Sequence, residues 1–227
     1  ILLLDISNVF NEDQIYNIFA LQATALFHGA YWQLVTSMFS HIWLPHLFFN
    51  VFSLFFVGNF LEKIIGRKKF FWFYIFSGIF AGIFYASLAF YFGISGIGEK
   101  IFFSPSVYSL GASGAIFGVA GLLAVLTPFL RVYLIMGPII ALVIQSVLNS
   151  TLPTSPITSL IDLLVTIYIF VSIFSMFSFH SSFRKIAIPV GMPFWVLPII
   201  AIVPLVIVGL FIPLPIGNSA HLGGLLV

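Results

Sequence analysis

A serine and a histidine more than a hundred residues apart each stand among small residues at the start of an apolar run. Ser113 belongs to GASGAIFG, residues 111–118, and His221 belongs to AHLGG, residues 220–224. A serine hydroxyl becomes an effective nucleophile when an adjacent base takes its proton, and neutral imidazole is such a base. Small residues let helices approach closely. The two sequences therefore favour a Ser–His contact that could attack a carbonyl group.

The sequence around Ser113 predicts that this residue lies in the first turn of a helix. Unpaired backbone N–H groups and the positive end of the helix dipole favour a developing oxyanion there. Phe117 follows four residues later and shares the helix face of Ser113. Gly114 and Gly118 form a Gly-xxx-Gly pair that permits close helix contact. The alternative interpretation is that this sequence serves helix packing alone.

A third group of polar side chains lies in HIWLPHLFFN, residues 41–50. His46 and Asn50 are four residues apart and share a helix face, whereas His41 is expected to point elsewhere. Asparagine and neutral histidine are suitable donors for an oxyanion hole. The two histidines could also suggest a metal site, but no cysteine or cluster of carboxylates accompanies them, so no metal is predicted.

These three sequences, together with YWQLVTSMF at residues 31–39, resemble the rhomboid family of intramembrane serine proteases. They occur in the family's order and cover most of the chain. The resemblance implies that Ser113 is the nucleophile and His221 the general base of a catalytic dyad. It also implies an oxyanion hole formed by Asn50, His46 and the backbone N–H of Ser113. No cofactor is implied.

The same resemblance assigns supporting roles. Gly111 and Gly114 are expected to shape the loop at the nucleophile, and Phe117 is expected to pack its ring against His221. His41 is counted with these supporting residues. One position departs from the family pattern, because the usual Trp-Arg of the first external loop is Trp32-Gln33 here. The loop therefore lacks a charged anchor, which puts its usual stabilisation in doubt.

The composition independently favours a membrane protein. Of 227 residues, 61% are hydrophobic and only 6% are charged, more apolar surface than a soluble domain can bury. The lipid bilayer is the partner that this composition predicts, and the resemblance to the rhomboid family implies transmembrane protein substrates. The eight basic residues are attributed to membrane topology, and no nucleic acid partner is predicted.

The apolar runs predict the membrane segments. Residues 15–27 are too few to span and are expected to form an interfacial or re-entrant segment. Spans are expected at 43–61, 70–92, 113–127, 132–148, 160–179 and 186–212, with a last helix beginning at His221. The Ser113 helix has a length of only about 21 Å against roughly 30 Å of hydrocarbon. Ser113 is therefore expected some way below the outer surface, at the foot of a cavity that admits water.

The predicted fold is an all-α polytopic membrane protein with a rhomboid-like six-helix core. Its first and last helices are expected to be truncated in this chain. Residues 1–227 are predicted to form a single membrane domain, in which residues 129–183 are an inserted two-helix transmembrane hairpin. The hypothesis for this hairpin is that it packs outside the catalytic core, and the alternative is that it fills a groove within the core.

The charges predict the orientation of the spans. If the Ser113 helix runs inward, one side carries seven of the eight basic residues, namely Lys63, Arg67, Lys68, Lys69, Arg131, Arg184 and Lys185. The positive-inside rule makes that side cytoplasmic. The active site is therefore expected to open to the extracytoplasmic side of the cell membrane.

The predicted function is hydrolysis of peptide bonds in or beside transmembrane helices of other membrane proteins. One alternative is a non-catalytic rhomboid-like protein that only binds membrane clients. Another is a transporter or channel, which would usually place ionisable residues at mid-membrane. Asp162 is the only candidate for such a residue. The sequence assigns no oligomeric state.

Overall fold

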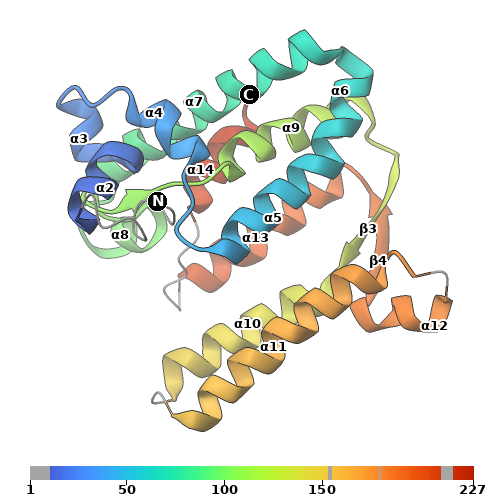
Figure 1. Cartoon of the computed structure of the whole chain (residues 1–227). Coiled ribbons are helices and arrows are strands. Elements are labelled where there is room, and N and C mark those ends of the chain that lie inside the picture. Colours follow the sequence, from blue (N-terminus) through green and yellow to red (C-terminus); the bar gives the residue numbers. More distant parts are fainter. Residues whose placement is uncertain (1–10, 153–154, 179, 211–216) are drawn as a thin grey trace. The chain divides into compact units, whose positions relative to one another are not determined.

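The computed structural model describes residues 11–152, 155–178, 180–210 and 217–227. Helices dominate it, as Figure 1 shows, which agrees with the expected helical fold. The described residues form two compact units, one within Ile1–Pro128 and Pro198–Val227 and the other within Phe129–Leu197. The last turn of the truncated first helix is predicted at the apolar residues 1–4, which lie outside the described residues.

The N-terminal part of the first unit consists of short elements. They are α2 (Glu12–Phe19), β1 (Leu21–Gln22), α3 (Ala23–Phe27), α4 (Gln33–Thr36) and the 3-10 turn η1 (Ser37–Phe39). Asn11 caps α2 through a capping box with Gln14. Residues 15–27, expected not to span, are thus divided between two helices and a strand.

Two long apolar helical segments follow. The first joins α5 (Leu44–Ser53), the π-helical turn η2 (Leu54–Gly58) and α6 (Asn59–Ile65), and the second is α7 (Arg67–Phe92). Gly66, at φ +85°, separates them. Both are long and apolar enough to cross a membrane. They confirm the helices predicted for residues 43–61 and 70–92.

The rest of the first unit carries the predicted catalytic pair. Helix α8 (Gly96–Phe102) and strand β2 (Tyr108–Ser109) precede α9 (Ser113–Leu126), and α14 (Asn218–Leu225) lies near the C-terminus. The short strand β2 pairs antiparallel with β1, with Leu21 opposite Ser109. Helix α13 (Val196–Gly209) crosses the boundary between the two units.

Glycines set the packing of α7, α9 and α14. A Cβ added at Gly118 would lie 2.6 Å from the Ser77 side chain of α7 and 3.1 Å from the Gly224 carbonyl oxygen of α14. A Cβ at Gly114 would lie 2.8 Å from the Ala81 Cβ. Neither site has room for a side chain. The Gly-xxx-Gly pair therefore lets the helix of Ser113 pack closely on two neighbouring helices.

The second unit contains a helical hairpin and a two-stranded ribbon. Its elements are β3 (Arg131–Ile135), α10 (Met136–Thr151), α11 (Pro156–Ser175), α12 (Ser181–Arg184), the 3-10 turn η3 (Lys185–Ala187) and β4 (Pro189–Pro193). Figure 1 shows α10 and α11 side by side. Gln145 and Asn149 of α10 donate hydrogen bonds of 2.7 and 3.2 Å to Oδ1 of Asp162 on α11. These bonds tie the two helices together.

Two predicted spans are wrong at their starts. Residues 131–135 and 189–193 form an antiparallel ribbon, so α10 begins at Met136 and α13 at Val196. Valine, isoleucine and tyrosine favour strands, and Pro189 and Pro193 cannot continue a helix. The ends of the spans predicted at 160–179 and 186–212 lie partly outside the described residues.

Helix α11 agrees with the span predicted from residue 160, and it is the third helix long and apolar enough to cross a membrane among the described residues. The structure also holds two short ribbons that the all-α prediction lacked. The six-helix core, the single domain and the inserted transmembrane hairpin at 129–183 stay predictions.

Candidate active site

Ser113 and His221 are in direct contact. Ser113 is the first residue of α9, and its Oγ lies 2.8 Å from Nε2 of His221 on α14. This distance confirms the predicted contact. His221 is buried, and its Nδ1 has no hydrogen-bond partner in the part of the chain that the structure describes. In the tautomer that has its ring proton on Nδ1, the Ser113 hydroxyl donates to Nε2.

Phe117 holds the imidazole from one side. The Phe117 and His221 rings are stacked, with centroids 4.3 Å apart and an angle of 18° between their planes. The predicted packing is thus present. Because Phe117 lies one turn after Ser113 on α9, a single helix supplies both the hydroxyl and the surface that orients the ring.

Gly111 brings the third predicted group to the same place. It has φ +125°, and a Cβ added there would lie 2.8 Å from His46 Cε1 and Nε2 and 3.6 Å from Asn50 Nδ2. Asn50 is only 6% exposed. Its Nδ2 donates to the His46 carbonyl oxygen at 3.1 Å, which uses one of the two amide hydrogens. The second amide hydrogen makes no hydrogen bond to any described residue, so it is available on the side of the Ser113 loop.

The sequence predicted that His41 points away from His46, and the structure contradicts this prediction. Their rings meet edge to face, with centroids 5.0 Å apart. The reason is that His41 precedes α5, so helical spacing does not apply to it. Burial, assisted by the neighbouring His46, lowers the pKa of His41 from 6.5 to about 4. His41 is therefore a neutral support for the His46 ring.

Two anchors of the Ser113 loop were missed by sequence reasoning. The backbone N–H of Gly111 donates to the Ser37 carbonyl oxygen at 2.9 Å. The hydroxyl of Tyr85, buried in α7, donates to the Val107 carbonyl oxygen at 3.1 Å. Tyr85 is one of three tyrosines in α7, with Tyr74 and Tyr91, so the sequence did not single it out. Nothing in the sequence indicated Ser37.

Gln33 takes the place of the missing charged anchor in the first external loop. It is 1% exposed, its Oε1 accepts from the Gln22 backbone N–H at 3.1 Å, and its Nε2 donates to the Asn17 carbonyl oxygen at 2.8 Å. The neighbouring Trp32 donates to the Ile18 carbonyl oxygen at 3.1 Å. A neutral amide therefore anchors this loop, which resolves the doubt raised by the Trp-Gln departure.

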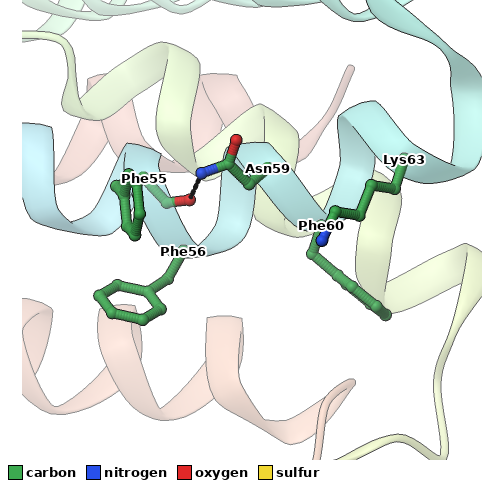
Figure 2. A pocket seen from close by; sticks show the side chains of 5 residues that line it. All are labelled: Phe55, Phe56, Asn59, Phe60 and Lys63. Atoms are coloured by element: carbon green, nitrogen blue, oxygen red, sulfur yellow. Dashed lines mark hydrogen bonds between the residues drawn. The ribbon is translucent and has the colours of Figure 1, made fainter.

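Among the described residues, no group of three or more His, Cys, Asp or Glu side chains could hold a metal ion. A cavity of about 450 Å³ lies along η2 and α6 and contains none of the predicted site residues; it is lined by Phe55, Phe56, Asn59, Phe60 and Lys63 (Figure 2).

Comparison with known proteins assigns the family. A family model of the rhomboid domain matches residues 28–158, more than half of the chain. The chain belongs to the rhomboid family. The matched range includes Asn50 and Ser113 and ends before His221, which this rhomboid brings to Ser113 through α14.

Two curated relatives illustrate the similarity. Rhomboid protease GluP of Bacillus subtilis (strain 168) is 34% identical over 104 residues, which cover 46% of this chain and 17% of that protein. Rhomboid protease AarA of Providencia stuartii is 37% identical over 107 residues, which cover 46% of this chain and 36% of that protein. The chain thus aligns with well under half the length of either relative.

Proposed function

We propose that this rhomboid is an intramembrane serine protease that uses Ser113 as its nucleophile and His221 as its general base. The observation that carries the proposal is the 2.8 Å contact between Ser113 Oγ and His221 Nε2. His221 is buried, and its Nδ1 has no hydrogen-bond partner, acidic or otherwise, among the described residues, which supports a dyad. The protease names of the relatives support the same activity.

The proposed reaction has two stages. Ser113 Oγ attacks the carbonyl carbon of the scissile peptide, and its proton passes to Nε2 of His221. The imidazolium then returns this proton to the leaving amine as the C–N bond breaks, which leaves an acyl-enzyme. His221 next takes a proton from a water molecule as the water oxygen bonds to the ester carbonyl carbon. The bond between this carbon and Ser113 Oγ then breaks, the imidazolium returns the proton to Oγ, and the carboxylic acid product leaves.

The proposed oxyanion hole consists of Asn50 Nδ2, the backbone N–H of Ser113 and His46. A Cβ added at Gly111 would lie close to Asn50 and His46, which supports this assignment because both side chains lie beside the loop that precedes Ser113. The N–H of Ser113, at the start of α9, has no carbonyl one turn earlier within the helix. Gly111, Gly114, Phe117 and His41 keep these groups in place.

The proposed substrates are transmembrane helices of other membrane proteins. Helix α9 has 14 residues and a length of about 21 Å, against roughly 30 Å of hydrocarbon, which favours a nucleophile below the membrane surface. The charge distribution favours an opening to the extracytoplasmic side. A bound helix must unwind at the scissile bond, so small or helix-breaking residues are expected near the cut.

Labelling with a fluorophosphonate probe tests the proposal. The purified full-length protein should be labelled in proteoliposomes and should cleave a reporter transmembrane helix, whereas Ser113→Ala and His221→Ala should do neither. Thermal unfolding of each variant checks that the fold is intact. Turnover by purified Ser113→Ala would overturn the mechanism, and an unlabelled wild type that binds the reporter would identify a non-catalytic client-binding protein.

A further inference from the structure

The ribbon of β3 and β4 has one regular hydrogen-bonding pattern. Two bonds extend the ladder beyond the strands: Phe194 N–H donates to Leu130 O at 2.8 Å, and Met136 N–H donates to Ile188 O at 3.1 Å. Hydrogen-bonded and non-hydrogen-bonded pairs alternate in an antiparallel ladder. On the β3 side these bonds are made by Leu130 and Met136, which both have even numbers. The even-numbered residues therefore bond to β4, and the odd-numbered residues of β3 direct their backbone groups away from β4.

The outer edge of β4 is closed by proline. The register pairs Pro193 with Arg131, Gly191 with Tyr133 and Pro189 with Ile135, so these three residues of β4 face outward. Proline has no N–H, which leaves Gly191 as the only outward donor. Prolines at outward positions are a known protection against edge-to-edge pairing.

The outer edge of β3 has no such protection. Arg131, Tyr133 and Ile135 each direct one N–H and one carbonyl outward, and none of these groups makes a further backbone hydrogen bond to any other described residue. The ring of Tyr133 lies over Gly191, 3.2 Å from the position of an added Cβ, yet the side chain is 64% exposed. The ribbon therefore has one open and one closed edge.

We propose that the open edge of β3 pairs with β3 of a second copy of this chain. Antiparallel pairing about a twofold axis at Tyr133 places the two Tyr133 residues opposite each other and Arg131 opposite the second copy's Ile135. The outward groups then form about six hydrogen bonds, two for each of three pairs. The two Arg131 side chains do not face each other, so the register avoids a repulsion between like charges.

The closed edge of β4 limits this association to a dimer. Each β3–β4 ribbon offers one pairing edge, so the resulting four-stranded sheet ends in a proline-blocked strand on both sides. A twofold contact of this kind closes on itself and cannot extend into a filament. The dimer does not depend on the proposed protease activity.

Cysteine cross-linking of the full chain tests the proposal directly, because the sequence contains no cysteine. Directly opposed hydrogen-bonded residues have Cα atoms about 5.5 Å apart, which suits a disulfide. Tyr133→Cys in proteoliposomes should therefore form a disulfide dimer under mild oxidation. Val190→Cys is the matched control, since Val190 is an exposed residue on the closed strand of the same ribbon, and it should stay monomeric. Equal cross-linking at both positions would overturn the proposal.

A second variant places a proline on the open edge of β3, as Pro189 and Pro193 are placed on the outer edge of β4. Tyr133→Pro removes an outward N–H that the ribbon itself does not use, so the ladder should survive while the dimer is lost. Single-molecule photobleaching in liposomes should show dimers for the wild type and monomers for Tyr133→Pro. Dimers that persist in this variant, or a wild type that is monomeric, would overturn the proposal. In the monomeric case the edge would be free for an extended segment of another protein.

Discussion

The Phe117 ring lies flat against the His221 imidazole at 4.3 Å, and this contact joins α9 to α14. A stacked pair of this kind contributes about 0.5–1.5 kcal/mol beyond its buried area. Phe117→Leu should therefore lower kcat/KM by roughly 2- to 10-fold, because the imidazole loses its fixed orientation. Phe117→Tyr, which keeps the ring, should retain activity in the same reporter assay. Equal losses in both variants would show that ring stacking is not the cause.

Asn50→Ala should lower kcat on the order of 10²-fold, because one donor to the proposed oxyanion is lost. Asn59→Ala is a matched control. Asn59 lies on the continuation of the same helix, and its Nδ2 donates to the Phe55 carbonyl oxygen at 2.6 Å, as Figure 2 shows. Like Asn50, Asn59 donates from its side chain to the carbonyl oxygen four residues earlier, but it is not one of the predicted site residues. Similar rates for the two variants would remove Asn50 from the oxyanion hole.

Gly111→Ala should abolish most activity, because its Cβ would lie 2.8 Å from the His46 ring and displace it. The positive φ adds a strain of about 1–3 kcal/mol. Gly66→Ala separates the two effects, since Gly66 also has a positive φ but no atom within 4 Å of an added Cβ. Thermal unfolding should shift in both variants, whereas only Gly111→Ala should lose probe labelling.

Gln33→Met should destabilise the first external loop. The buried amide satisfies the Gln22 N–H and the Asn17 carbonyl, and methionine leaves both groups unpaired at a cost of about 1–3 kcal/mol each. Hydrogen exchange at residues 15–36 should therefore increase, with less effect on α7. Unchanged exchange in this segment would show that other contacts anchor the loop.

The lowered pKa of His41 predicts a pH-dependent contribution to stability. The folded state favours neutral His41, so this contribution is present above pH 6.5, the ordinary pKa, and is lost as the pH falls toward about 4. Thermal unfolding measured between about pH 7.5 and about pH 5 should show a smaller decrease for His41→Gln than for the wild type. A larger decrease in the variant would contradict the assignment.

The contacts among the candidate site residues were more predictable from sequence than the backbone of the second unit. Ser113, His221 and Phe117 are found in contact because small residues at fixed spacings leave few ways for their helices to pack. Composition alone could not predict β3 and β4, because the apolar run Val132–Ile135 is compatible both with a strand and with the start of a helix. Their pairing depends on residues some 60 positions apart, which no local pattern records.

The anchors of the site were beyond sequence reasoning for a different reason. Ser37 contributes only its carbonyl oxygen, and any residue could supply that group. Gln33 was read as the loss of a charge, whereas its two hydrogen bonds depend on the positions of Asn17 and Gln22 after folding. His41 was misplaced because helical spacing was applied to a residue before the helix begins.

The π-helical turn Leu54–Gly58 separates the segment that carries Asn50 from the rest of its helix. A π turn accommodates one more residue than the α-helical hydrogen-bonding pattern allows, and each residue of an α-helix advances the direction of the side chains by about 100°. The turn therefore behaves as a one-residue insertion that leaves the helix faces on either side in register. A relative lacking that residue would present the same faces, and its alignment with this chain should open a single gap within residues 54–58.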